Sequence, residues 1–309
     1  DSAAFAITAA AAHHVVDVRV DGVSIGATDS VTLTNVQSDH ALWAVFAPDT
    51  VDIAAAAGAN GAITPGATIA VAAVGSSPMI TAAIPYGASQ TYLITADPGY
   101  HVADVIVDGV SVGPVSSYTF ESVLEPHTIL AEFALDTYDI TPSAGPNGSI
   151  TPDDVRAVPY GESVTFDMTP AAGYRVLSVL VDGSSVGNAY SYTFTNVTAP
   201  HSISVSFAPK LATSLTVRSS TSRPRRYRSF TLSGSLRPGQ PAGTTVALQA
   251  WRPNRRVWTT IWVGPVNRYS NWAKSYRPTV RGTHYFRTIF YGNRDYAPVM
   301  SRRLTLRVR

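Results

Sequence analysis

Short runs in which apolar and polar residues alternate follow one another along the whole chain. Ser-Val-Thr-Phe-Asp-Met at 163–168 is one such run, and Leu-Thr-Leu-Arg-Val at 304–308 is another. Alternation with a period of two is typical of half-buried β-strands, and the Gly, Pro, Asn-Gly and Asp-Gly residues between the runs predict tight turns. We therefore expect an all-β fold of many short strands, in which no segment requires a helix.

Part of this pattern occurs three times. The segments 14–22, 101–109 and 175–183 align without gaps and share Val-x-x-Val-x-Val-Asp-Gly. From the Asp of each Asp-Gly pair, a His follows at 19 positions and a Phe at 25 positions, which gives His40, His127, His201, Phe46, Phe133 and Phe207. Two recurring spacings indicate internal repeats. The chain accordingly divides into repeat 1 (1–48), repeat 2 (49–135), repeat 3 (136–209) and a C-terminal domain (210–309).

Repeat 3 carries the most regular copy of the pattern. Its alternating stretches predict about six short strands. Asn147-Gly148 is a pair that favours positive φ, and it predicts the turn of an opening hairpin. Asp182-Gly183 predicts the turn that closes a later strand. A unit of this kind is expected to fold as a small β-sandwich or barrel.

Repeats 1 and 2 depart from this copy in opposite ways. Repeat 2 has 13 extra residues after Gly61, and this stretch includes Ala67–Gly75, a further candidate strand. In repeat 1 the segment 2–8 aligns with 89–95, so the opening hairpin has no counterpart and the repeat is incomplete. An open sheet edge is a template for another strand. We consider three explanations for the missing hairpin of repeat 1. The strand at 67–75 fills its place within the chain, a strand from a neighbouring molecule fills it, or the chain is merely cut at an arbitrary boundary.

The motifs of repeat 3 resemble the divergent B-repeat family of internalin-type bacterial surface proteins. The matching motifs are Tyr138, Gly145-x-Asn-Gly-x-Ile, Pro159-Tyr-Gly, Pro170-x-x-Gly-Tyr, Val181-Asp-Gly and the closing run from His201 to Phe207. The likeness covers 136–208, and 49–134 with an insertion. It implies a secreted or wall-attached protein in which the repeats act as stalks, spacers or adhesive units.

The C-terminal domain shows a different set of turn-delimited strands. Its motifs Ser233-Gly-Ser-Leu, Gly243-Thr-Thr-Val-Ala-Leu-Gln and Gly282-Thr-His-Tyr-Phe-Arg resemble the Ig-like modules common in actinobacterial secreted proteins. That resemblance implies an Ig-like β-sandwich outside the cell. The complete expectation is therefore tandem small β-sandwich or barrel repeats followed by an Ig-like β-sandwich.

Charge divides the chain at the same place. The net charge is +2, but residues 1–209 hold three basic and 20 acidic residues, which gives −17. Residues 210–309 hold 20 basic residues and one acid, Asp295, which gives +19, and 18 of these cations are Arg. Such a step predicts that the two parts meet different partners, or each other.

The basic domain contains the residues best suited to binding. Trp and Arg interleave between 251 and 262, and a second run of Arg lies at 223–228. The candidate polymer-binding residues are Arg252, Arg255, Arg256, Trp258, Trp262, Arg225 and Arg226. Guanidinium groups pair with anions and aromatic faces stack, so an anionic cell-wall polymer or glycan is the expected ligand, and nucleic acid is not expected. The structural alternative is core Trp with solvated Arg.

Two recurring motifs have the residue types of catalysis but not its context. Gly-x-Ser-x-Gly occurs at 22–26, 109–113 and 183–187, where another strand follows the serine, so a hairpin is predicted in place of a nucleophile elbow. The repeated His residues lie a whole repeat apart, which favours a structural role over metal ligation. We expect no catalytic residue, no metal and no cofactor.

These observations predict a non-enzymatic structural or adhesive protein, located outside the cell or on its surface and without a membrane span. Its expected partners are the anionic polymer and the chain itself, because strand complementation at repeat 1 would assemble subunits head to tail into a fibre. The alternative is the non-catalytic polymer-binding or cell-wall-binding tail of a larger secreted enzyme.

Overall fold

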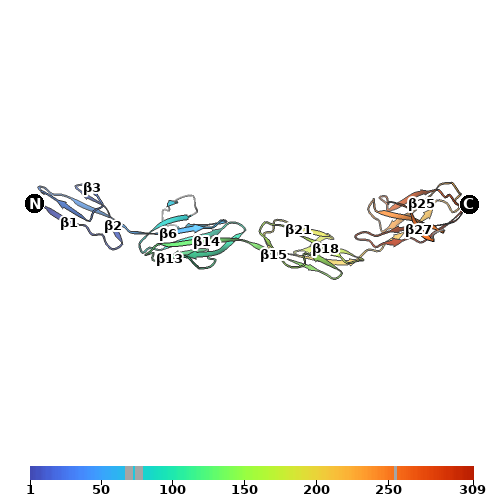
Figure 1. The fold of residues 1–309 in the computed structure, drawn as a ribbon, viewed down its shortest axis with the longest axis horizontal. Coiled ribbons are helices and arrows are strands. Elements are labelled where there is room, and N and C mark those ends of the chain that lie inside the picture. The colour runs from blue at the N-terminus through green and yellow to red at the C-terminus, as the bar shows by residue number, and fades with distance from the viewer. Residues whose placement is uncertain (67–71, 74–78, 254–255) are drawn as a thin grey trace. The chain divides into compact units, whose positions relative to one another are not determined.

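The computed structural model describes residues 1–66, 72–73, 79–253 and 256–309, and Figure 1 shows its strands along the chain. All regular secondary structure in these ranges is β, so the predicted all-β fold is confirmed. The described ranges contain no helix with the length and apolar character needed to cross a membrane.

The chain forms two compact units. The first comprises Asp1–Thr137 and Pro159–Gly161, and the second comprises Tyr138–Val158 and Glu162–Arg309. Buried hydrophobic residues form three separate clusters, one in repeat 2, one in repeat 3 and one in the C-terminal domain. The four-part division of the sequence stays a prediction.

Repeat 3 builds its core between two sheets. Its strands are β15 (Thr137–Ala144), β16 (Gly148–Thr151), β17 (Arg156–Pro159), β18 (Val164–Pro170), β19 (Tyr174–Val181), β20 (Ser184–Gly187), β21 (Ser191–Phe194) and β22 (His201–Pro209). Hydrogen bonds order them β17-β15-β22-β19-β20 and β16-β18-β21. Phe166 from one sheet and Val176 and Ile203 from the other are buried in one cluster. The result is the small β-sandwich that the alternation predicts.

Repeat 2 has the same strand order as repeat 3, read from the opposite edge, with one additional edge strand. Its strands are β6 (Thr50–Ala57), β7 (Gly61–Pro65), β8 (Ala72–Ala73), β9 (Met79–Pro85), β10 (Gln90–Ala96), β11 (Tyr100–Val107), β12 (Val110–Ser111), β13 (Ser117–Phe120) and β14 (His127–Leu135). They form the sheets β12-β11-β14-β6-β9-β8, in which β8 is the additional strand, and β13-β10-β7. Of the predicted strand Ala67–Gly75, most lies outside the described residues. Ala72 and Ala73 pair with β9 of the same repeat.

The prediction of an opening hairpin at Asn147-Gly148 is wrong. Asn147 has the expected positive φ of 71°, but β15 pairs in parallel with β22 while β16 pairs with β18 in the other sheet. The turn is an arch that carries the chain from one sheet to the other. A Cβ on Gly148 would lie 2.4 Å from the Phe207 ring, so glycine is needed where the chain passes over this ring. By contrast, Asp182-Gly183 does join a hairpin, between β19 and β20.

Repeat 1 contains fewer strands. They are β1 (Ala3–Ala6), β2 (His13–Val20), β3 (Val23–Gly26), β4 (Ser30–Leu33) and β5 (Leu42–Pro48), and they form the sheets β3-β2-β5 and β1-β4. The pairing of Phe5 with Val31 matches that of Tyr92 with Tyr118, as the sequence alignment predicts. Among the hydrophobic residues of this repeat, only Val18 and Val31 are buried.

The C-terminal domain is an Ig-like sandwich of two antiparallel sheets. Its strands are β23 (Ser214–Leu215), β24 (Arg218–Ser219), β25 (Phe230–Arg237), β26 (Thr245–Arg252), β27 (Val257–Pro265), β28 (Asn271–Tyr276), β29 (Gly282–Phe290), β30 (Val299–Met300) and β31 (Leu304–Val308). One sheet joins β25 to β23, β24 and β28, and the other joins β27, β26, β29, β30 and β31. Leu232, Leu248 and Phe286 are buried in its core.

Candidate functional sites

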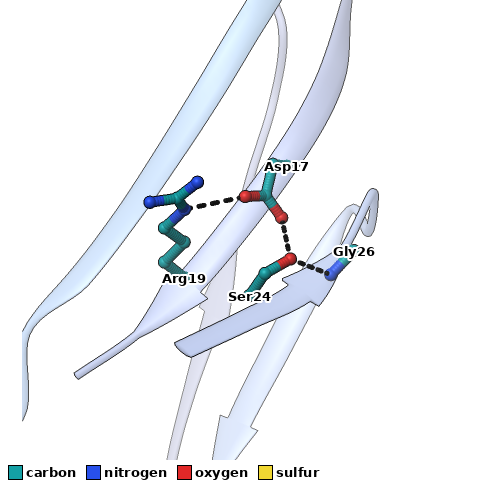
Figure 2. Close-up of polar contacts among 4 residues, drawn as sticks. All are labelled: Asp17, Arg19, Ser24 and Gly26. Atoms are coloured by element: carbon teal, nitrogen blue, oxygen red, sulfur yellow. Dashed lines mark hydrogen bonds and ion pairs between the residues drawn. The ribbon is translucent and has the colours of Figure 1, made fainter. Parts of the chain in front are cut away.

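The Gly-x-Ser-x-Gly segment of repeat 1 lies in the hairpin between β2 and β3 (Figure 2). The Ser24 hydroxyl donates to Asp17 Oδ1 at 2.5 Å and accepts the Gly26 amide N–H at 3.3 Å. The Arg19 Nε–H donates to Asp17 Oδ2 at 2.9 Å, and this bond, together with that from Ser24, lowers the pKa of Asp17. A strand follows the turn that precedes the serine, so the predicted hairpin is confirmed.

The bond between Ser24 of β3 and Asp17 of β2 joins the two strands of the hairpin, and we call it the serine brace. An equivalent bond occurs in the other repeats. Ser111 donates to Asp104 Oδ1 at 2.7 Å in repeat 2. In repeat 3, Ser178 replaces the aspartate, and its hydroxyl lies 3.3 Å from that of Ser185. Because the brace forms with or without a carboxylate, its common feature is the link between two paired strands.

The repeated histidines bind the aspartates of the Asp-Gly turns. Their Nδ1 atoms lie 2.5–2.7 Å from a carboxylate oxygen in the pairs His40–Asp21, His127–Asp108 and His201–Asp182. In repeat 3 the Ser202 amide also donates to Asp182 at 2.8 Å, and this bond and that of His201 lower the pKa of Asp182. We call this arrangement the Asp–His clasp. It ties a turn to the start of the last strand, which is the structural role predicted for these histidines.

A second kind of His–Asp pair was not found from the sequence. His14 Nδ1 lies 2.9 Å from Asp49 Oδ1, and His101 Nδ1 lies 2.8 Å from Asp136 Oδ1. Both pairs have the same separation of 35 residues, which is the signal that would have revealed them. Over the part of the chain that the structure describes, His, Asp and Glu side chains form no group of three that could hold a metal ion.

Repeat 1 differs from the other repeats along one edge of β5. In repeats 2 and 3 the equivalent strands β14 and β22 pair with an additional parallel strand. There the Ala131 carbonyl accepts the Gly58 N–H, and the Val205 carbonyl accepts the Gly145 N–H, both at 2.8 Å. Ala44 occupies the equivalent position, and within the described ranges its carbonyl receives no such bond.

Apolar side chains are exposed beside this unpaired edge. Trp43 is 67% exposed and Phe46 is 42% exposed. The counterparts of Phe46 are half-buried, and each ring covers a glycine of the arch that repeat 1 does not contain. Phe5, 42% exposed, lies on the second sheet at the position where Tyr92 is fully buried. We call the free edge of the chain at residues 40–44, which includes the start of β5, together with these three aromatic side chains, the open edge of repeat 1.

One of the predicted polymer-binding residues lines a pocket at one end of the C-terminal domain, and a second bonds to another lining residue of that pocket. Arg252 ends β26 and lines a pocket of about 580 Å³. The Arg226 Nε–H donates to the Thr279 carbonyl at 2.8 Å, and Thr279 lines the same pocket. The other aromatic and cationic lining residues are Trp251, Tyr276, Arg281, His284 and Tyr285. We call this the cationic pocket. Trp251 belongs to the Trp and Arg pattern at 251–262, but the sequence did not indicate the other four, because they lie on other strands or in a connecting segment and share no local motif.

The two predicted tryptophans have different surroundings. Trp258 packs edge-on against Trp251 with ring centroids 5.6 Å apart, and the Arg287 guanidinium lies 4.4 Å above its ring. Trp262 instead packs against Trp272, with centroids 5.8 Å apart, at the hydrophobic core. Trp258 therefore borders a residue of the cationic pocket, whereas Trp262 fits the structural alternative.

The remaining predicted arginines are not placed in the pocket. Arg225 and Arg256 are exposed, and neither lines the cationic pocket. Arg255 lies outside the described residues. Of the predicted set, the structure places Arg252 in the lining of the pocket, and it places Arg226 and Trp258 against the lining residues Thr279 and Trp251. That these residues bind a polymer stays a prediction.

Comparison with known proteins identifies no family. No family matches the chain, and no curated protein matches it. A β-glycosidase from Bacteroides vulgatus is similar over 81% of this chain at 8% identity and a TM-score of 0.22, and the chain spans 25% of that protein. A tandem segment of titin is similar over 85% of this chain and 97% of its own length, at 8% identity and a TM-score of 0.25. The Escherichia coli adhesin FdeC is similar over 84% of this chain and 96% of its own length, at 10% identity and a TM-score of 0.22. At these scores the likeness carries no argument about function.

Proposed function

We propose that the protein is an extracellular or cell-surface structural protein with an adhesive role, built from B-repeat-like units and an Ig-like domain. The recurring polar contacts support a structural role. The Asp–His clasps and the serine braces each join a strand to a turn or to another strand. Such contacts hold a module together and leave binding to its edges and loops.

The finer proposal is that copies of the chain assemble head to tail at the open edge of repeat 1. The observation that carries it is the unpaired Ala44 carbonyl beside the exposed rings of Trp43 and Phe46. A strand of a second copy adds in parallel to β5, as β15 does to β22, and covers these side chains. Such a contact is heterologous, so it propagates into a fibre, and the charge of −17 on residues 1–209 of one copy attracts the charge of +19 on residues 210–309 of the next.

Negative-stain microscopy and sedimentation of the purified full chain test the assembly. At about 10 mM salt, where charges act over about 30 Å, fibres should form and lengthen as protein concentration rises. Two variants should remain monomeric. Ala44→Pro removes an N–H on the free side of β5, and Trp43→Lys places a charge on the edge.

Val23→Lys is the matched control for Trp43→Lys. Val23 is also 67% exposed, but it lies on β3, away from the open edge. This variant should assemble like the unmodified chain. The assembly proposal fails if the unmodified chain stays monomeric at every concentration, or if Ala44→Pro forms the same fibres.

A second candidate function is that of the polymer-binding tail of a larger secreted enzyme. The cationic pocket favours this candidate, because it gathers Arg252 and Arg281 beside aromatic rings. The complete reading frame distinguishes the two functions. An upstream catalytic domain supports the tail, and a surface protein with no catalytic domain supports the structural role.

A further inference from the structure

The cationic pocket lies where three strands of the sandwich end or begin. β26 ends at Arg252, β28 ends at Tyr276, and β29 begins at Gly282. Its lining therefore comes from both sheets and from the segment 277–281 between β28 and β29. A pocket built from strand ends has walls held by the sheets, and its volume of about 580 Å³ falls within the usual range for small-ligand sites.

Two arginines of the pocket have no partner of their own in the described part of the chain. The guanidinium groups of Arg252 and Arg281 take part in no hydrogen bond or ion pair there, whereas that of Arg226 is held by the Thr279 carbonyl and by the ring of Tyr227. Asp295 is the sole acidic residue of the whole domain. The charge of the two guanidinium groups is thus left for an external anion, with which guanidinium forms two parallel hydrogen bonds.

The remaining lining residues supply ring faces and hydrogen-bonding groups. Trp251 is half-buried and steadied by Trp258. Burial raises the pKa of Tyr276, and the positive charge of Arg252 opposes this rise, so the phenol lies within the field of that arginine. His284 Nε2 donates to the Val280 carbonyl at 2.9 Å, which fixes the imidazole ring at the pocket wall.

We propose that the cationic pocket binds an acidic saccharide, that is, one or two sugar rings carrying a carboxylate or a sulfate. The guanidinium groups of Arg252 and Arg281 bind the anion, the Trp251 and Tyr285 rings pack against the sugar, and the Tyr276 hydroxyl bonds to a sugar oxygen. A single-stranded nucleic acid requires an extended basic groove that follows several phosphates, and a pocket of about 580 Å³ fits a short acidic glycan better. This inference names a ligand for the adhesive role, and it rests on the proposal that the protein is located outside the cell or on its surface.

Titration calorimetry on the purified full chain tests the assignment with three probes. These are a sulfated heparin-type tetrasaccharide, a galacturonate tetramer and neutral maltotetraose. We expect binding of one or both acidic probes and none of the neutral probe, and the two acidic arms distinguish sulfate from carboxylate as the bound group. Affinity should fall as salt rises, because the ion pairs are screened.

Substitutions locate the binding. Arg252→Gln and Arg281→Gln should each weaken binding of the acidic probe about tenfold or more, and Tyr276→Phe a few-fold. Arg268→Gln is the matched control, since it removes the same charge near the other end of β28, where Arg268 stacks on Tyr269. It should change the affinity less than about twofold. Far-ultraviolet circular dichroism should be the same for all variants.

Two results would overturn the proposal. One is that no acidic probe binds, and the other is that Arg268→Gln weakens binding as much as Arg252→Gln, which would indicate diffuse charge with no defined site. Neither result affects fibre assembly, which is measured separately at the open edge of repeat 1. Failure of the pocket and failure of assembly are therefore distinguishable.

Discussion

Repeat 1 and repeat 3 share a sequence pattern but differ in how much of it they bury. Phe5 and Phe166 occupy the same position of the pattern, yet Phe5 is 42% exposed and Phe166 is fully buried. Val18 and its counterpart Val179 are both fully buried. The first pair differs because repeat 3 contains the arch of β15 and β16, which adds one strand to each sheet.

This comparison separates two layers of information. The alternation and the Asp-Gly turns are enough to form the hairpin of β2 and β3 and its pairing with β5, since these appear in all three repeats. Burial of the apolar side chains of the second sheet also requires the two strands that the arch connects, one in each sheet. A repeat without an arch therefore keeps its local structure and exposes its core, which makes its edge a place for binding.

The largest expected effect concerns the core. Phe166→Ala removes a fully buried ring and should lower the free energy of unfolding of repeat 3 by about 3–5 kcal/mol. Phe5→Ala, at the same position of repeat 1, should cost less, about 1 kcal/mol, because 42% of that residue is already exposed to water. Native-state hydrogen exchange measures both, since it resolves the repeats separately. Equal losses at the two positions would mean that repeat 1 is packed like repeat 3.

A smaller effect concerns the arch. Gly148→Ala places a Cβ against the Phe207 ring and should destabilise repeat 3 by about 1–3 kcal/mol. The double variant Gly148→Ala with Phe207→Leu should recover part of this loss, because the smaller side chain makes room. Phe46→Leu in repeat 1 should change stability by about 0.5 kcal/mol or less. Chemical unfolding followed by hydrogen exchange checks these values, and additive effects of the two changes in repeat 3 would contradict the contact.

The smallest effect concerns the Asp–His clasp, which repeats 1 and 3 share. Bonds from the Ser202 amide and from His201 keep the pKa of Asp182 below 3.8 in the folded protein, and the bond from His40 does the same for Asp21. A lowered carboxyl pKa contributes stability that is fully present above 3.8 and is lost as the pH falls through the folded pKa. Both repeats should therefore lose stability in acid over this window.

Asp182→Asn should flatten this acid loss in repeat 3 and leave that of repeat 1 unchanged. Unfolding measured from about pH 6 to about pH 2 gives the two curves. Asp153→Asn is the control, because it removes an equal charge without removing a hydrogen bond to a histidine. An acid loss in Asp182→Asn as steep as in the unmodified chain would show that the clasp does not contribute.

Much of the fold follows from the sequence, and the site follows from it less well. Alternation predicted the strands, Asp182-Gly183 predicted its hairpin, and the spacing of 19 residues marked the two partners of the clasp before their bond was known. Asn147-Gly148 predicted the local backbone correctly and the pairing wrongly, because positive φ determines a turn and not the strand that each arm meets. Arg252 was found, but Arg281 and Tyr276 were not, since nothing local connects them.

The sequence by itself determined the all-β character of this protein, its repeats and the step in charge between residues 1–209 and 210–309. These depend on composition and short-range order, which act within a strand or a turn. Only the tertiary structure decided which strands pair across sheets, that β5 has an open edge, and that Arg252 and Arg281 line one pocket. Those outcomes depend on contacts between residues far apart in the chain, where burial and hydrogen bonding select among pairings that the local pattern allows equally.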